Sequence, residues 1–201
     1  YALVIVNIRN VNDAPTILNP DPTYCYAQEN KKGQPLQCLS YTPTTTVSWA
    51  TAKAYGRSIL NVSDPDYGDT FTWAVVDSNK IVQINNETGN LTLSAALDYE
   101  IRELYSGLVV TVFDAAKASD YTFLTLTVLD VNDNPTFADT TLTVDEDASV
   151  GTVVAYLASY ADDEDTGDYA STLTYSLSRE SDTFNLTNQG GLHVKATAQL
   201  D

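Results

Sequence analysis

The chain has 201 residues, enough for one large domain or two small ones, and its 27 acidic and 10 basic residues give a formal net charge of −17. This charge excludes binding to nucleic acid and to anionic membrane surfaces, because like charges repel. Threonine, valine, tyrosine and leucine dominate, and no stretch keeps an apolar period of 3.6 residues. We therefore expect strands rather than helices, with no membrane-spanning run and no direct membrane contact.

The expected elements are short strands separated by turn residues, which is typical of an all-β sandwich. A strand at residues 4–9 comes first and is followed by a polar segment that ends at Pro15. About seven further strands follow it, at residues 24–28, 58–62, 70–76, 81–84, 91–93, 108–113 and 121–129. The turn before residues 91–93 contains Gly89, which can adopt a positive φ.

The segment at residues 31–55 departs from this pattern. Thirty-four residues separate Glu29 from Asp64, whereas sixteen separate the equivalent Glu146 and Asp163. We expect the excess to form an extended loop or an extra hairpin. Its tryptophan, Trp49, is expected to cover the edge of the sandwich, and an exposed Trp49 would instead be a candidate contact for a partner.

Cysteines and glycosylation sequons indicate an oxidising, secretory setting. A disulfide between Cys25 and Cys38 would close a loop of about a dozen residues at the start of the insert, and would stabilise the fold by roughly 3 kcal/mol. The Asn-X-Ser/Thr sequons predict glycosylation at Asn61, Asn86, Asn90 and Asn185.

The chain also repeats itself, and the repeats predict its domain plan. Residues 4–17 match residues 124–137 position for position, so that Asp13 and Asp133 are 120 residues apart. Further matches join residues 64–68 to 163–167 and residues 89–98 to 190–201. Their phase predicts that residues 1–14 are the last strand and linker of one repeat. Residues 15–134 are then a complete repeat, and residues 135–201 are the first part of a following one, in a window onto a longer chain.

The segment at residues 129–137 has the character of a cation-binding connector. Pro135 lacks the N–H that a sheet ladder needs, so the strand before it cannot continue. The acidic and amide side chains that precede Pro135 offer oxygen atoms on several sides, as calcium prefers. Acidic clusters recur at residues 64–66, 98–100, 145–147 and 162–165. Solvated acidic loops are the simpler interpretation of any single cluster, but repelling carboxylates gathered at matched positions favour cations.

The sequence Asp-Val-Asn-Asp-Asn-Pro-Thr-Phe at residues 130–137 closely resembles the calcium linker between cadherin repeats. The cadherin motifs recur in order along the whole chain. The resemblance implies tandem seven-stranded Greek-key β-sandwiches with calcium ions (Ca2+) bound between consecutive repeats. It also implies an extracellular protein, either anchored at the cell surface by a single membrane span or secreted.

For the junction around residue 132, the resemblance implies ligands from both repeats and from the linker. The complete repeat and the following repeat would supply side chains, the linker would supply side chains and backbone carbonyls, and a further carbonyl would come from near Tyr169. The side-chain ligands are Glu29, Asp98, Glu100, Asp130, Asn132, Asp133, Asp163 and Asp165, and the linker carbonyls are those of Val131 and Asn134.

For the preceding junction, the resemblance implies a related set of ligands. The side chains are those of Asn12, Asp13, Asp64, Asp66 and Asp114, and the carbonyl is that of Ala14. Asn10 stands where the other linker has Asp130, which removes one negative charge. We therefore expect weaker binding of calcium at this junction, or the absence of one ion.

Other chemistry has little support in the sequence. Asp98 and Glu100 form a carboxylate pair of the kind used for acid–base catalysis, but no nucleophile motif, activating histidine or phosphate-binding glycine loop accompanies them. Asp163-Glu-Asp-Thr-Gly resembles an EF-hand loop only faintly, because the closing glutamate and the flanking helices are missing. No spacing of cysteine and histidine suggests zinc. The sequence therefore indicates a protein that is not an enzyme.

Two functions remain open at this point. In the first, calcium stiffens the repeats for cell adhesion, and the partner is another cadherin-like protein, of the same kind or a different one. In the second, the segment is a structural spacer, in contact only with neighbouring copies of a long filament. The insert at residues 31–55 is the feature that distinguishes this repeat. If the segment is adhesive, the insert would be a binding surface specific to this repeat.

Overall fold

The computed structural model describes residues 7, 9–165 and 173–195. The chain divides into two compact units, at residues 1–131 and 132–201. The expected strand at residues 4–9 lies largely outside the described residues, as does Tyr169. No helix among the described residues is long and apolar enough to cross a membrane. The repeat boundaries after residues 14 and 134 stay predictions.

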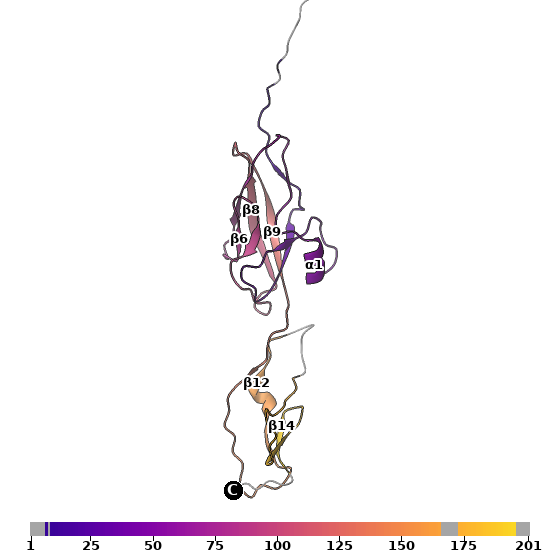
Figure 1. Cartoon of the computed structure of the whole chain (residues 1–201), viewed down its shortest axis with the longest axis vertical. Coiled ribbons are helices and arrows are strands. Elements are labelled where there is room, and N and C mark those ends of the chain that lie inside the picture. The colour runs from indigo at the N-terminus through magenta and orange to yellow at the C-terminus, as the bar shows by residue number, and fades with distance from the viewer. Residues whose placement is uncertain (1–6, 8, 166–172, 196–201) are drawn as a thin grey trace, which may run out of the picture. The chain divides into compact units, whose positions relative to one another are not determined.

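The first unit is built on a five-stranded sheet, and two pairs of short strands complete it (Figure 1). In the large sheet β2 and β9 run parallel, and the other neighbours are antiparallel. Its strands, in spatial order, are β3 (Gln37–Cys38), β2 (Thr23–Gln28), β9 (Ser119–Leu129), β8 (Leu104–Phe113) and β5 (Thr72–Val76). The short pairs are β1 (Thr16–Ile17) with β4 (Val62–Ser63), and β6 (Val82–Ile84) with β7 (Leu91–Leu93).

Alternating side chains on these strands build the main core. On β9, Leu124, Leu126 and Val128 are fully buried, and the residues between them are partly exposed. Successive side chains on a strand point to opposite faces, so this alternation directs every second residue inward. Trp73 of β5 lies in the same core, and its ring is 2.8 Å from the position that a Cβ on Gly89 would occupy. The positive φ of Gly89 and this close approach both require glycine.

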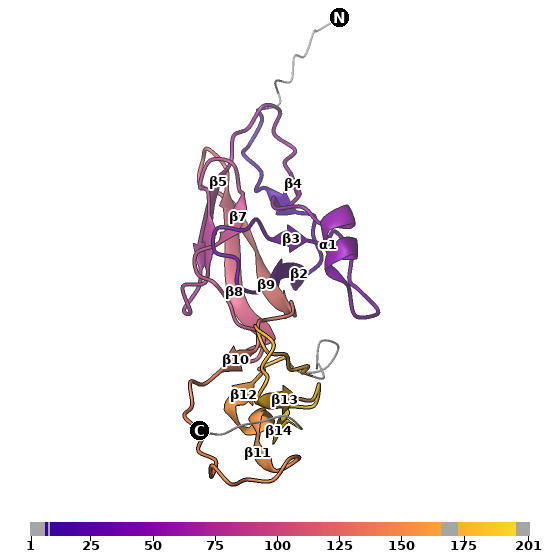
Figure 2. The same cartoon turned by 60° about the horizontal axis from the view of Figure 1, so that its bottom comes forward.

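The insert contains a short helix, where the sequence predicts an extended loop or an extra hairpin. Helix α1 (Trp49–Tyr55) begins at Ser48, whose hydroxyl accepts a hydrogen bond from the Thr51 amide, and ends where the Gly56 amide donates to Ala52. Figure 2 shows α1 beside β2 and β3, at one edge of the large sheet. A disulfide joins Cys25 on β2 to Cys38 on β3.

A second, smaller apolar cluster holds α1 in place. It consists of Tyr26, Leu39, Val47 and Ala52, with Tyr24, Trp49 and Leu129 packed partly buried against it. Trp49 therefore covers the sheet edge rather than standing exposed. The sequence does not predict this helix, because seven residues are too few for an apolar period, and packing rather than intrinsic propensity stabilises such a short helix.

Two expected strands also differ in extent. Residues 58–62 contribute only the start of β4, because the chain bends at residues 58–59 after a single bridge between Cys38 and Arg57. Strand β8 begins at Leu104 instead of residue 108, and its pairing with β9 shifts register between Tyr105 and Leu108. Gly107 lies in this irregularity with φ +80°, and so lets the strand continue through the bulge.

The second unit contains two small sheets. The first pairs β10 (Thr136–Phe137) with β12 (Ala161–Asp162), and the second has the order β11 (Val153–Tyr156), β14 (Gly191–Val194), β13 (Phe184–Leu186). A 3₁₀ turn, η1 (Leu157–Tyr160), connects β11 to β12. The amide of Tyr175 donates to the carbonyl of Asn188, as Trp73 donates to Asn86 in the first unit. Gly190, with positive φ, lies against the Tyr175 ring, as Gly89 lies against Trp73. The two units therefore share local architecture at matched positions.

Candidate metal centres

The N-terminal end of the first unit gathers carboxylates from three segments. Asp64 follows β4 directly, and Pro65 prevents the strand from continuing. Asp69 lies in the turn before β5, and Asp114 comes directly after β8. Asp64, Asp69 and Asp114 each offer an oxygen, and these three oxygens lie within 4.8 Å of one another. The ends of two strands thus converge on one acidic cluster.

The linker at residues 10–13 binds to this acidic end through N–H groups. The Asn10 Nδ2 donates to Asp66 Oδ1, and the Asp13 backbone amide donates to Asp66 Oδ2 over 2.8 Å. The Asn12 Nδ2 donates to Asp114 Oδ2 over 2.6 Å and also approaches the Asp13 carbonyl. The hydrogen bonds from Asn10 and then Asp13 stabilise the ionised carboxylate and lower the pKa of Asp66.

Two oxygens in the same cluster accept no hydrogen bond within the part of the chain that the structure describes. Asp64 Oδ2 and Asp69 Oδ2 are buried and accept no hydrogen bond from any residue that the structure describes. Burial raises the pKa of Asp69, and the carboxylates of Asp64, Asp114 and Asp66 raise it further. A carboxylate in this position is stabilised by a bound cation or by a proton.

Asp69 is a member of the cluster that the sequence prediction missed. The signal is present in the sequence, since Asp-X-Asp-X-Gly-Asp occurs both at residues 64–69 and at residues 163–168. The spacing of two residues singles out only the first two aspartates of each motif, and the third lies beyond the glycine. The last aspartate of the second motif lies outside the described residues.

The other end of the first unit has a more deeply buried carboxylate. Glu29 comes directly after β2, and its side chain is only 1% exposed. Its Oε2 accepts a hydrogen bond of 2.8 Å from the Tyr99 amide, and its Oε1 accepts one from the Val131 amide. These contacts tie the loop at residues 98–100 and the end of β9 to one side chain. Glu29 therefore stabilises the fold through these hydrogen bonds and also lies where it could bind a metal ion.

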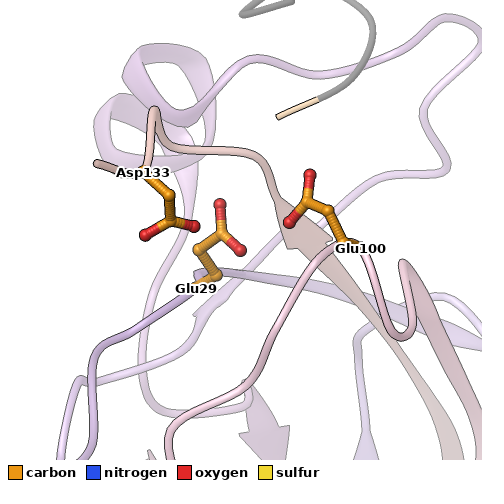
Figure 3. Close-up of side chains that lie close together, drawn as sticks. All are labelled: Glu29, Glu100 and Asp133. Atoms are coloured by element: carbon orange, nitrogen blue, oxygen red, sulfur yellow. The ribbon is translucent and has the colours of Figure 1, made fainter. Parts of the chain in front are cut away.

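The carboxylate of Glu100 lies close to Glu29, and that of Asp130 lies close to Glu100. An oxygen of Glu100 lies within 4.8 Å of one on Glu29, and an oxygen of Glu100 lies equally near one on Asp130. Figure 3 draws the carboxylates of Glu29 and Glu100, together with Asp133, which belongs to the second unit. Asp98 has a different role, because its Oδ1 accepts a hydrogen bond of 2.7 Å from the Ile101 amide and so caps the turn that presents Glu100. Among the described residues, Asp98 is outside the carboxylate groups that converge within this distance.

The second unit repeats the arrangement of the N-terminal linker. The Asp133 amide donates to Asp165 Oδ2 over 2.9 Å, as the Asp13 amide donates to Asp66. The Asp165 amide donates to Asp163 Oδ1 over 3.3 Å, as the Asp66 amide donates to Asp64 over 2.8 Å. Both linkers thus bind the second aspartate of an Asp-X-Asp turn through the same backbone amide.

Asp165 is also the most buried of these turn carboxylates. It is 8% exposed, and its Oδ1 accepts no hydrogen bond from the part of the chain that the structure describes. Burial raises the pKa of Asp165, and the Asp133 amide partly opposes this increase. Like Asp69, this carboxylate lies where a cation would remove an electrostatic penalty.

The remaining expected ligands are consistent with oxygen coordination. The Asn132 Nδ2 donates to the Asp133 carbonyl, which leaves its amide oxygen pointing elsewhere as an acceptor. Ala14, Val131 and Asn134 lie in segments without ladder pairing, so their carbonyls are not used by a sheet. Every group in these sets would bind a metal through an oxygen atom. Oxygen ligands suit a hard cation such as calcium and disfavour zinc, copper and iron–sulfur clusters.

The predicted glycosylation sites differ in their exposure to solvent. Asn86 and Asn185 are exposed, whereas Asn61 and Asn90 are half-buried. Asn90 accepts a hydrogen bond from the Ser58 hydroxyl. Modification at these four residues stays a prediction.

No family model matches the chain, but comparison with known proteins finds relatives that are cadherins. Mouse Protocadherin Fat 2 is 38% identical over 152 residues, which is 71% of this chain, and Cadherin-related hmr-1 of Caenorhabditis elegans is 26% identical over 193 residues, or 93% of this chain. The chain spans only 3% and 6% of the length of these two relatives.

Solved structures agree with the fold. Human Protocadherin-24 EC1-2 superposes with a TM-score of 0.63 at 22% identity, and the match covers 94% of this chain and 80% of that one. Drosophila N-cadherin EC1-4 gives a TM-score of 0.60 at 23% identity, over 94% of this chain and 42% of the other. At these identities the likeness concerns the fold alone.

The short-stranded sandwich and the sequence relatives define an extracellular repeat protein that is not an enzyme. The chain belongs to the cadherin superfamily, as a segment of its extracellular cadherin (EC) repeats. This confirms the resemblance seen in the linker sequence and, with it, the expectation of a mostly β fold. The acidic groups at the ends of the first unit are consistent with calcium sites of this family.

Proposed function

We propose that this segment binds calcium at the junctions around residues 12 and 132, and that calcium stiffens the array of repeats for cell adhesion. One observation carries the proposal. In both units a linker amide holds the second aspartate of an Asp-X-Asp turn, and buried carboxylate oxygens beside that contact accept no hydrogen bond from the described residues. Oxygens in this condition are suited to a divalent cation.

The ligand sets follow the sequence expectation with one addition. Around residue 12 the side chains of Asn12, Asp13, Asp64, Asp66 and Asp114 would hold calcium with the Ala14 carbonyl, and Asp69 joins them because its oxygen lies in the same cluster. Around residue 132 the side-chain set is Glu29, Asp98, Glu100, Asp130, Asn132, Asp133, Asp163 and Asp165. The carbonyls of Val131, Asn134 and Tyr169 complete it, the last of these outside the described residues.

The physical consequence is a coupling of binding to stiffness. Ligands come from the linker and from the repeats on either side of it, so calcium binds well only when these parts hold a fixed arrangement. The free energy of binding then opposes bending, by about 2.7 kcal/mol for one site at a calcium concentration 100 times its dissociation constant. Without calcium, repulsion between the carboxylates favours movement at the linker.

Isothermal titration calorimetry of the 201-residue chain tests the metal half of this proposal. After treatment with a chelator, calcium should bind with dissociation constants of about 0.1 to 1 mM or tighter, as in other extracellular modules. Magnesium is the matched control, and it should bind more weakly because it demands near-octahedral geometry and retains its water ligands. Absence of calcium binding at several millimolar would contradict the proposal.

Sedimentation velocity separates the adhesive role from the spacer role. Members of this family are adhesion proteins, and another cadherin-like molecule is the partner that we propose. A calcium-dependent dimer of the 201-residue chain would support an adhesive surface within this segment, with the exposed residues of the insert at residues 31–55 as the first places to mutate. A monomer that becomes more asymmetric in calcium would favour the spacer role, with adhesion located elsewhere in the protein.

A further inference from the structure

The two linkers of the chain form a natural matched pair. Both contain Val-Asn-Asp, at residues 11–13 and 131–133, and both lead into a proline. The residue before Val-Asn-Asp differs, since it is Asn10 in the first linker and Asp130 in the second. An amide can donate a hydrogen bond, whereas an ionised carboxylate can only accept one.

Asn10 uses that capacity within the first unit. Its Nδ2 donates to Asp66 Oδ1, while the Asp13 amide donates to Asp66 Oδ2, so each oxygen of Asp66 accepts a hydrogen bond. The equivalent aspartate of the second unit, Asp165, accepts the linker amide on Oδ2 only. Its Oδ1 accepts no hydrogen bond from the residues described. The two aspartates therefore differ in the hydrogen bonding of one oxygen.

A carboxylate oxygen that already accepts a hydrogen bond has one lone-pair site fewer to offer calcium. At Asp66 Oδ1 calcium competes with the Asn10 amide for the lone pairs of that oxygen, and Asn10, unlike Asp130, brings no negative charge to its junction. Calcium affinity of oxygen sites depends on the number of charged ligands. The first junction therefore has a weaker attraction for calcium and a stronger internal bond without it.

We infer that Asn10 holds the first linker on its repeat when calcium is absent, and that it lowers the calcium affinity of that junction. This inference rests on the proposed function, and it adds regulation to it. As the calcium concentration rises, the second junction fills first. As it falls, the first linker releases its calcium early but stays attached to Asp66, so that the two linkers do not loosen together.

Reciprocal exchanges test the inference in the 201-residue chain. Asn10→Asp removes the donor and adds a charge, and Asp130→Asn makes the opposite change in the second linker. Asn10→Ala is the matched control, because it removes the donor without adding a charge. Amide hydrogen exchange of residues 9–16 and 129–137 is measured in chelator and along a calcium titration, and circular dichroism verifies that each variant is folded.

The expected results have opposite signs in the two conditions. In chelator, Asn10→Asp and Asn10→Ala each increase exchange at residues 9–16 by about fivefold, the effect of losing one hydrogen bond. In calcium, Asn10→Asp lowers the calcium concentration that protects residues 9–16 by about tenfold. Asn10→Ala gives no such gain, and Asp130→Asn raises the concentration that protects residues 129–137.

Failure of the inference can be told from failure of the proposed function. Calcium protection of residues 129–137 in the unmodified chain reports on the proposed function and does not involve Asn10. If that protection is seen but Asn10→Asp leaves both the chelator exchange and the calcium midpoint of residues 9–16 unchanged, the inference is wrong. A calcium midpoint that is lower for residues 9–16 than for residues 129–137 in the unmodified chain would also overturn it.

Discussion

The two ends of the first unit hold carboxylates in different ways. At the C-terminal end, Glu29 is buried on the sheet and ties two separate backbone segments together through the Tyr99 and Val131 amides. At the N-terminal end, Asp64 and Asp69 lie in a loop, half exposed, with an oxygen each that has no donor among the described residues. The comparison teaches that one end is preorganised by hydrogen bonds to a buried glutamate of the sheet, whereas the other is organised partly by N–H groups of the linker.

Removal of Glu29 should have the largest effect on stability. Glu29→Ala deletes a buried charged acceptor and leaves the Tyr99 and Val131 amides unsatisfied, which should lower the free energy of unfolding by about 3 kcal/mol even in chelator. Thermal and urea unfolding measure this loss. Glu87→Ala, an exposed position in the turn between β6 and β7, is the matched control and should change stability by less than about 0.5 kcal/mol. Equal stability of the two variants would mean that the C-terminal end is not preorganised.

Substitution of Asp114 should have an intermediate effect on the free energy of unfolding. Asp114 is 1% exposed and accepts hydrogen bonds from the Ala118 amide and the Asn12 side chain. Asp114→Asn should lower the free energy of unfolding in chelator by about 1 kcal/mol, because relief of repulsion with Asp64 and Asp69 offsets part of the lost hydrogen bonding. The same variant should weaken calcium binding in calorimetry. A variant with unchanged calcium binding would exclude Asp114 as a ligand.

Asp69 should show the smallest effect on stability and a clear effect on binding. Asp69→Asn removes a repelling carboxylate from the loop, so stability in chelator should stay within about 0.5 kcal/mol of the unmodified chain or rise. Calcium binding at the N-terminal end should weaken by about tenfold, since one charged ligand is lost. Asp139→Asn, at an exposed position of the second unit, controls for the change in net charge. If both variants bind calcium equally, Asp69 is not a ligand.

Much of this arrangement could be predicted from the sequence, for identifiable reasons. Turn residues and alternating side chains predict β5, β7 and β9 closely, and the internal repeat matches Gly89 with Gly190, which lie against the rings of Trp73 and Tyr175 in the two units. Strand periodicity and turn chemistry are local, so the sequence states them directly. The linker sequence likewise indicates the cadherin superfamily, which the comparisons confirm.

The missed features depend on contacts between distant residues. Helix α1 has too short a sequence to show an apolar period, and it forms because Ala52 packs with Tyr26 and Leu39 in a small cluster. Asp69 joins Asp64 and Asp114 only because the ends of β4 and β8 meet in space. The hydrogen bond from Asn10 to Asp66 joins residues 56 positions apart, and the sequence could identify the lost charge but not the donor that replaced it.

Limited proteolysis of the 201-residue chain, with cleavage sites mapped by mass spectrometry, tests the central claim most directly. Excess chelator should expose residues 130–135 to rapid cleavage and residues 10–15 to slower cleavage, and calcium should protect both linkers. Calcium-dependent protection at both linkers would support cations as the source of their rigidity. Equal cleavage with calcium and with chelator at both linkers would contradict it.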